Sequence, residues 1–132
     1  MSEIRIADAA RFLGVSDDTV RRWIDQGALI SARSATGQTV VDGLELARLL
    51  KERAAPPEDP AHVASSARNR FVGLVTEVVS DTVMSQVELQ CGPHRVVSLM
   101  STEAVRDLGL EPGRVATAVI KSTNVVVEIP GR

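Results

Sequence analysis

Apolar residues recur at helical spacing at the start of the chain. Ile6, Ala9, Ala10 and Leu13 fall on one face of a helix, and Gly14 stands where a helix ends in the left-handed conformation. The first element is therefore predicted to be a short amphipathic helix.

The residues that follow predict a second helix of about ten residues. Ser16 is a favourable N-cap, and Asp17 and Asp18 suit the positive end of the helix dipole. The apolar face consists of Val20, Trp23 and Ile24, whereas the other faces carry Asp17, Thr19, Arg21, Arg22 and Gln26. Two short helices joined by a tight turn form a helix-turn-helix, whose exposed side chains could reach DNA.

A β-like stretch over residues 28–41 comes next, with a turn at 34–37. Asp42 is placed to cap a third helix, in which Leu44, Ala47 and Leu50 form an apolar stripe that we expect in the core. Residues 54–60 then bring three prolines and two acids, which cannot continue a helix and favour an extended linker.

The second half of the chain changes to runs typical of strands. We expect strands over residues 71–80, 84–90, 95–100, 115–121 and 124–129, and a short helix over 102–108 that Gly109 ends. Five short strands with one helix favour a small OB-like closed barrel. The chain is thus predicted to be an α+β protein with a helix-turn-helix domain (1–54), a linker (55–65) and a five-stranded barrel (66–132).

The composition excludes several classes of function. Apolar residues make up 44% of the 132 positions and charged residues 24%, which is typical of globular proteins. The single cysteine, Cys91, excludes an internal disulfide, and with His94 alone it does not complete a metal site. No catalytic triad or carboxylate pair stands out, so we expect no enzyme activity. Without a signal peptide or membrane-length apolar run, we expect a cytoplasmic protein.

The first domain resembles the MerR/excisionase type of winged helix-turn-helix. The resemblance is carried by residues 6–16, residues 19–24 and Gly27. It implies that Thr19, Arg21 and Arg22 face the major groove of DNA, and that residues 31–39 form a wing over the DNA backbone. Arg33 and Gln38 of this wing are then further DNA-contacting candidates.

Two features depart from that family. Asp17 and Asp18 stand where its members often have basic residues, and the hairpin segment 34–38 carries no charge. The net charge of the chain is −2, so the phosphate affinity of one copy is expected to be low. A helix-turn-helix that serves only packing or protein binding is the alternative.

Two short motifs in the second half offer the groups that hold an oxyanion. Ser66-Ala67-Arg68-Asn69 precedes the first expected strand of this half, and Lys121-Ser122-Thr123 comes near the end of the domain. A bound tetrahedral dianion needs compensating positive charge and several N–H or O–H donors. Arg68 and Lys121 provide the charge, and the serines, the threonine and nearby backbone amides provide donors.

At these motifs the second domain resembles the Mop (molbindin) domains of the TOBE class. The resemblance also covers Gly73, residues 87–89, 101–105 and 108–110, Gly113 and residues 118–125. It implies that molybdate or tungstate binds between subunits, with Ser66, Arg68, Lys121 and Ser122 on one side and Ser101 from the other subunit. Ala104 stands where many members have a second hydroxyl residue. The resemblance further implies a homo-oligomer, a dimer at least and possibly a hexamer.

These features lead to the hypothesis of a molybdate- or tungstate-responsive DNA-binding transcriptional regulator. The first alternative is a molybdate storage or homeostasis protein whose helix-turn-helix domain binds a protein partner. The second is a DNA-binding protein whose barrel serves only to form oligomers.

Overall fold

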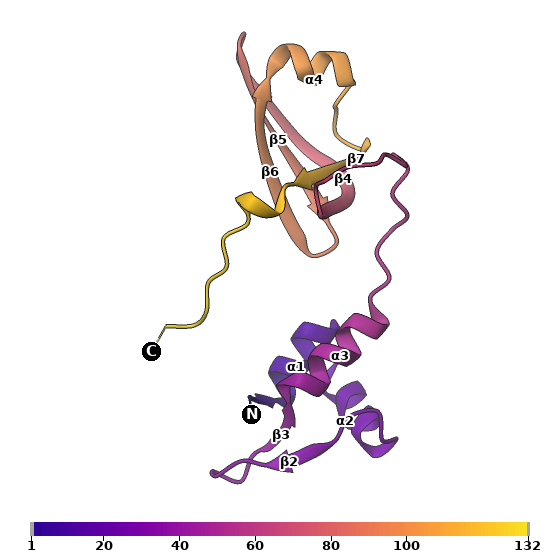
Figure 1. Ribbon diagram of the computed structural model, residues 1–132, viewed down its shortest axis with the longest axis vertical. Coiled ribbons are helices and arrows are strands. Elements are labelled where there is room, and N and C mark those ends of the chain that lie inside the picture. Colours follow the sequence, from indigo (N-terminus) through magenta and orange to yellow (C-terminus); the bar gives the residue numbers. More distant parts are fainter. Residues whose placement is uncertain (1, 132) are drawn as a thin grey trace. The chain divides into compact units, whose positions relative to one another are not determined.

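The computed structural model of the protein describes residues 2–131 and divides the chain into two compact units, Met1–Ala55 and Pro56–Arg132. The N-terminal unit contains β1 (Glu3–Arg5), α1 (Ile6–Leu13), α2 (Asp17–Asp25), β2 (Ser31–Arg33), β3 (Thr39–Asp42) and α3 (Gly43–Arg53). The C-terminal unit contains β4 (Asn69–Ser80), β5 (Met84–Cys91), β6 (His94–Ser101), α4 (Thr102–Leu108), β7 (Val115–Ile120) and the 3-10 turn η1 (Ser122–Asn124). The expected α+β fold is confirmed (Figure 1).

The two helices of the helix-turn-helix form where the periodicity predicts them. Gly14 ends α1 in the left-handed conformation, with φ of 70°. Ser16 caps α2, because its Oγ accepts a hydrogen bond of 3.2 Å from the Thr19 amide. A cap of this kind contributes about 1 kcal/mol to helix stability. Val20, which is fully buried, points from α2 into the core that α1 shares.

The segment after α2 forms the expected hairpin of β2 and β3, but its surroundings differ from the prediction. The hairpin belongs to a three-stranded sheet of order β1–β3–β2, in which Ile4 lies opposite Val41. The strand β1 has only three residues, which is too few for an alternation of apolar and polar residues to be recognised in the sequence. Asp42 holds the N-cap position of α3 without a side-chain hydrogen bond, and the Gly43 amide at the start of this helix donates to the Ser2 carbonyl at 2.8 Å.

Only part of the expected stripe of α3 meets the core. Leu50 is half-buried and packs against the N-terminal core, whereas Leu44 is 58% exposed and Ala47 is also exposed. The fully buried positions are Leu46 and Leu49. Both sets of residues have helical spacing, so the periodicity predicts an amphipathic helix without deciding which face meets the core.

The C-terminal unit is built on an antiparallel sheet of order β6–β5–β4–β7. The long strand β4 pairs with β7 through its first half, where Asn69 lies opposite Ile120. Its second half pairs with β5 as far as Ser80, and a register shift between Val75 and Glu77 interrupts that ladder. Such a bulge bends a strand and increases its twist. The sheet is curled, and α4 covers one end of it (Figure 1).

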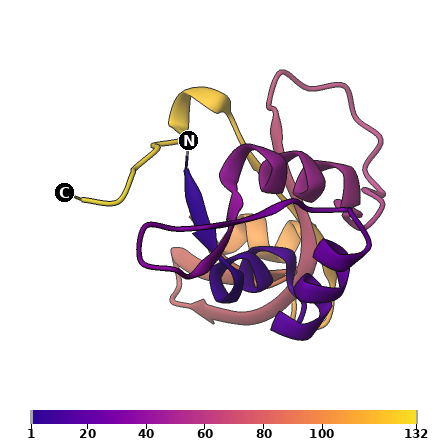
Figure 2. The same cartoon turned by 90° about the horizontal axis from the view of Figure 1, so that it is seen from below.

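The expected fifth strand over residues 124–129 is wrong. The turn η1 follows β7, and residues 125–131 are assigned to no strand. This tail runs away from the sheet in both views (Figures 1 and 2), and its Val126, Val127 and Ile129 are 84%, 83% and 78% exposed. Its apolar sequence is that of a strand, but a strand forms only beside a partner edge. Within residues 2–131 the barrel is therefore open and four-stranded.

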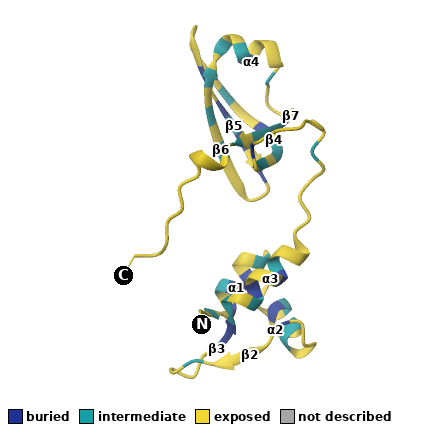
Figure 3. Ribbon diagram, viewed as in Figure 1, coloured by how far each residue is buried: buried dark blue, intermediate teal, exposed yellow. Residues whose placement is uncertain are grey.

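Each unit has its own aliphatic core (Figure 3). The buried residues of the N-terminal core are Ile6, Ala9, Ala10, Val20, Leu29, Val41, Leu46 and Leu49. Those of the C-terminal core are Val75, Val87, Leu89, Cys91 and Val105. None of the helices in the described range combines the length and apolar character needed to span a bilayer.

Candidate functional site

The pairing of β4 with β7 brings the two predicted oxyanion motifs to the same end of the sheet. Asn69 begins β4 opposite Ile120, which ends β7, and its Nδ2 donates to the Ile120 carbonyl at 3.2 Å. The segment Ser66–Arg68 therefore enters the sheet where Lys121–Thr123 leaves it, although Asn69 and Ile120 are 51 positions apart in the chain.

Two cations at this end have no carboxylate partner among residues 2–131. Arg68 and Lys121 are exposed, and among residues 2–131 neither forms an ion pair. The hydroxyls of Ser66, Ser122 and Thr123 are on exposed residues of the same two segments. An approaching anion therefore meets two positive charges and several donors without displacing a carboxylate.

Ala67 occupies a different position from its two neighbours. Its side chain is 8% exposed, and its amide donates to Ser65 Oγ at 3.1 Å. Because that amide already has an acceptor, Ala67 serves as an anchor beneath the loop that carries Ser66 and Arg68.

Ser101 lies at the opposite end of the sheet within the same chain. It ends β6 opposite Met84, beside the last residues of β4, whereas Arg68 precedes the first residue of that strand. Twelve residues of β4 correspond to roughly 35 Å of strand. Ser101 Oγ accepts a hydrogen bond of 3.1 Å from the Ala104 amide, so the hydroxyl proton remains free to donate. One chain therefore does not bring Ser101 beside Arg68 and Lys121.

A network of hydroxyls fixes this second end of the sheet. Ser85 is 1% exposed, and its Oγ shares hydrogen bonds with Ser80 at 2.7 Å and Thr102 at 2.9 Å. Thr102 also donates to the Asp81 carbonyl at 2.9 Å. The network holds the residue next to Ser101, and the strand pattern alone gave no sign of it.

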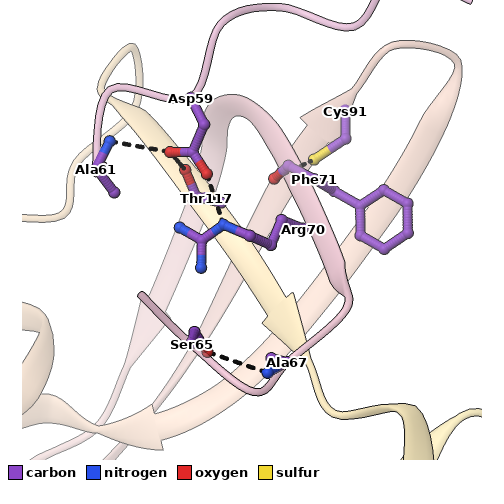
Figure 4. Close-up of polar contacts among 8 residues, drawn as sticks. All are labelled: Asp59, Ala61, Ser65, Ala67, Arg70, Phe71, Cys91 and Thr117. Carbon is purple, nitrogen blue, oxygen red and sulfur yellow. Dashed lines mark hydrogen bonds and ion pairs between the residues drawn. The ribbon is translucent and has the colours of Figure 1, made fainter. Parts of the chain in front are cut away.

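Asp59 forms a further polar cluster that the sequence did not single out (Figure 4). Its carboxylate accepts hydrogen bonds from Arg70 Nε at 2.7 Å, the Ala61 amide at 3.0 Å and Thr117 Oγ1 at 3.3 Å. The hydrogen bond from Arg70, followed by that from Ala61, lowers the pKa of Asp59 below its ordinary value. Asp59 lies in a proline-rich stretch, which indicates only a linker, so nothing in the sequence pointed to its contacts with Arg70 and Thr117.

Cys91 lies among core residues and not at an open site. The thiol is 7% exposed, donates to the Phe71 carbonyl at 3.6 Å (Figure 4), and has its pKa raised by burial. In the described range, no three His, Cys, Asp or Glu side chains are grouped so that they could hold a metal ion.

On the N-terminal unit, the arginines of α2 face solvent. Arg21 and Arg22 are exposed, whereas Val20, on another face of the same helix, is buried in the core. Arg21 borders an open hollow of about 480 Å³ whose other lining residues are Arg5, Ile6, Ala7, Asp8, Arg11, Asp17, Gln38 and Thr39. The hollow joins α1, α2 and the hairpin, so Gln38 and Arg21 share one surface.

Arg5 and Arg11 of this hollow were missed by the sequence reasoning, which considered only α2 and the hairpin. Both contact Asp8, through Arg5 Nε at 3.2 Å and Arg11 Nη1 at 3.8 Å. Their side chains remain 62% and 83% exposed. The hollow is thus lined by three exposed arginines, Arg5, Arg11 and Arg21, together with the carboxylates of Asp8 and Asp17.

Two other predicted DNA contacts are partly occupied by local bonds. Thr19 is half-buried, and its Oγ1 lies 3.0 Å from Ser16 Oγ in the cap of α2. Arg33 donates from Nη1 to the Gly37 carbonyl at 2.8 Å, which closes the hairpin turn. Arg33 retains other N–H groups for a ligand, whereas Thr19 contributes mainly to the helix start.

Comparison with known proteins assigns a family to each unit. Residues 4–54 match a helix-turn-helix domain family, and residues 65–127 match the TOBE domain family. These matches confirm the helix-turn-helix and the TOBE class, while the MerR/excisionase subtype stays a prediction.

Relatives of known name match one or both units. Molybdenum-pterin-binding protein 3 of Clostridium pasteurianum is 41% identical over 63 residues, which cover 47% of this chain and 93% of that protein. Molybdenum-pterin-binding protein MopA of Rhodobacter capsulatus is 33% identical over 107 residues, or 78% of this chain. The chain spans 40% of the length of MopA.

A solved structure also resembles the chain. The cytoplasmic molybdate-binding protein ModG, crystallised with molybdate bound, is 32% identical and gives a TM-score of 0.51 over 70% of this chain and 75% of that one. The relatives bear the names of binding proteins and not of enzymes, and the two matched domains are non-catalytic.

Proposed function

Because the chain belongs to the molybdenum-pterin-binding protein family, we propose that it binds molybdate or tungstate and regulates transcription by binding DNA. The observation that carries the proposal is the meeting of Ser66–Arg68 and Lys121–Thr123 at one end of the β4–β7 pair. The proposed location is the cytoplasm, as described for ModG.

The charge and donors at this end suit a tetrahedral dianion. Two unpaired cations balance two negative charges, and hydroxyl donors satisfy the remaining oxygen lone pairs. A site of this kind needs no metal ion. Donors held by a rigid sheet select an anion by size as well as by charge. The family resemblance implies a preference for molybdate and tungstate over the smaller sulfate.

The complete site is shared between two copies of the chain. Arg68 and Lys121 lie at one end of the sheet and Ser101 at the other, so Ser101 reaches an anion only from a neighbouring copy. A shared site buries the anion between subunits, where hydrogen bonds to charge are strongest. It also makes the anion a stabiliser of the assembly.

The open sheet supports the same assembly. An apolar hollow of about 490 Å³ lies between residues of β6 and β7, including Val96, Met100 and Val115. The exposed tail, with Val126 and Val127, has the apolar pattern of a missing strand. We take a dimer as the smallest functional form, and the resemblance extends this to a possible hexamer.

The N-terminal unit is proposed to bind double-stranded DNA. The support is the helix-turn-helix family match and the exposed arginines on α2 and around the adjoining hollow. A symmetric dimer presents two such helices at a set spacing, which a symmetric operator would match. We expect Arg21 and Arg22 to contact bases and phosphates. Gln38 shares the hollow with Arg21, and Arg33 belongs to the same hairpin as Gln38.

Molybdate controls DNA binding only through different affinities for two arrangements of the assembly. A mobility-shift titration of DNA upstream of the gene, with and without molybdate, tests this. We expect the midpoint to move with molybdate and not with equal sulfate. Arg68→Ala is the matched control, because it should retain basal DNA binding and lose the response. DNA binding that molybdate never alters would support a barrel that only forms oligomers.

The storage or homeostasis alternative is favoured by two observations on charge. The turn of the hairpin carries no charge, and the whole chain has a net charge of −2, which weakens phosphate binding. Under this alternative the chain binds molybdate tightly and no DNA fragment shifts at any anion concentration, while the N-terminal unit captures a protein.

A further inference from the structure

The loop that carries Ser66 and Arg68 is closed at its base by Asp59. This carboxylate accepts hydrogen bonds from three places at once: the Ala61 amide in the loop, Arg70 in β4 and Thr117 in β7 (Figure 4). Asp59 and Arg70 are 11 positions apart, so their contact joins the start of the loop to its end. The segment is therefore anchored to the sheet and is not a free linker.

Inside that loop, two observations show a defined conformation. Ala67 is buried, and its amide is bound by Ser65 (Figure 4). His62 has φ of 46°, in the left-handed region that residues other than glycine seldom adopt. Such a conformation persists when the surroundings impose it. The contacts of Asp59 and Ala67 are what holds His62 in this conformation, because the other residues of the loop are exposed.

The cluster also separates the roles of neighbouring arginines. Arg70 and Asp59 are paired at 2.7 Å, and their side chains are 24% and 26% exposed. Arg68, two positions earlier, is exposed and has no ion pair in the described residues. The Asp59 carboxylate thus pairs with Arg70, whereas Arg68 stays available to a ligand.

We propose that Asp59 is a positioning residue of the oxyanion site, which holds the Ser66–Arg68 loop in its binding conformation through Arg70 and Thr117. This rests on the proposed function. A loop that is ordered before the ligand arrives does not lose freedom on binding, so its affinity is higher. Around metal sites, loss of a contact that orients a ligating residue typically weakens metal affinity about 10- to 100-fold, and we expect the low end of that range for this anion site.

The test compares Asp59→Ala and Asp59→Asn with the parent by calorimetric titration with molybdate. We expect the dissociation constant to rise about tenfold in Asp59→Ala and less in Asp59→Asn, which keeps an acceptor oxygen. The exchanged pair Asp59→Arg with Arg70→Asp should recover part of the loss. Amide hydrogen exchange without anion should be faster in residues 61–68 of Asp59→Ala than in the parent.

The matched control is Arg95→Gln. It breaks an ion pair of equal length on the same sheet, Arg95 Nε to Glu88 Oε1 at 2.7 Å, away from the loop. Its affinity for molybdate should equal that of the parent. If Arg95→Gln weakens binding as much as Asp59→Ala, the effect is a general loss of barrel stability and the positioning role is wrong.

The outcomes separate the inference from the function on which it rests. If the parent itself does not bind molybdate, the proposed function fails and the inference with it. If the parent binds and Asp59→Ala binds equally well, the inference alone fails. If Asp59→Ala does not fold, Asp59→Asn decides: unchanged affinity and unchanged loop exchange overturn the proposal.

Discussion

Replacing either free cation of the proposed site should abolish most of the affinity for molybdate and leave the fold intact. Arg68→Ala and Lys121→Ala each remove one positive charge from the shared end of β4 and β7. Because each side chain is exposed and makes no ion pair within residues 2–131, its loss should change the free energy of unfolding by less than about 0.5 kcal/mol.

The expected effect on binding is larger, because in the proposed shared site the anion would be desolvated between two copies. A hydrogen bond to a charged group contributes about 1.5–3 kcal/mol. Losing one should therefore raise the dissociation constant about 10- to 150-fold. Removing both cations should cost more than either single change, and the two losses need not add, because both side chains meet one ligand.

Calorimetric titration with molybdate measures this effect, and urea unfolding of the same samples checks the fold. Arg48→Ala is the matched control, since it removes an exposed cation from α3 in the N-terminal unit, which carries no residue of the proposed oxyanion site. The reasoning is refuted if both variants bind like the parent, or if Arg48→Ala loses as much affinity as they do.

Three further predictions concern other parts of the chain. Arg21→Ala or Arg22→Ala should weaken DNA binding. The loss is about 1–3 kcal/mol with relaxed specificity if the side chain contacts a base, and it is equal for all sequences with a flatter salt dependence if the side chain contacts a phosphate. Mobility shifts at several salt concentrations that match those of the parent would contradict this. Gly73→Ala should destabilise the barrel by about 1–3 kcal/mol, because its Cβ would clash with the Gln90 carbonyl oxygen of the neighbouring strand; an unchanged urea midpoint would contradict the close approach. The stabilisation from Asp59, whose pKa is lowered in the fold, should be complete above its ordinary pKa of about 3.9 and disappear as pH falls through the lower folded value; a stability difference from Asp59→Asn that stays constant down to acid pH would contradict it.

Much of the fold was predictable because local rules agree with the tertiary structure. Gly14, Ser16 and Gly109 act at helix ends where backbone geometry leaves few choices. The helix over 102–108 was predicted with its observed bounds for the same reason, since Ser101 caps it and Gly109 ends it.

The wrong predictions of strands and of the buried helix face share one cause: each depends on contacts with a segment that is distant in the chain. Whether residues 124–129 form a strand depends on a partner edge, and the pattern in Val126 and Val127 says nothing about that edge. The buried face of α3 was decided by packing, which selected Leu46 over Leu44. The three-residue strand β1 exists only because β3 lies beside it.

The candidate site divides in the same way. Arg68 and Lys121 could be named from residue chemistry and family resemblance, but their proximity follows from the register of β4 and β7. The role of Asp59 could not be foreseen, because its three donors come from segments up to 58 positions away. A proline-rich sequence predicts only that no helix or strand forms there.

The central claim is an oxyanion site shared between two copies of the chain, and subunit mixing tests it most directly. Arg68→Glu and Ser101→Asp each place a carboxylate in one half of the site, and aspartate still serves as an N-cap of α4. Each variant alone should bind no molybdate. A mixed assembly joins the intact halves of both variants, so about a quarter of the sites should regain the affinity of the parent in calorimetric titration. Mixed assemblies that bind no better than the separate variants would contradict the shared site.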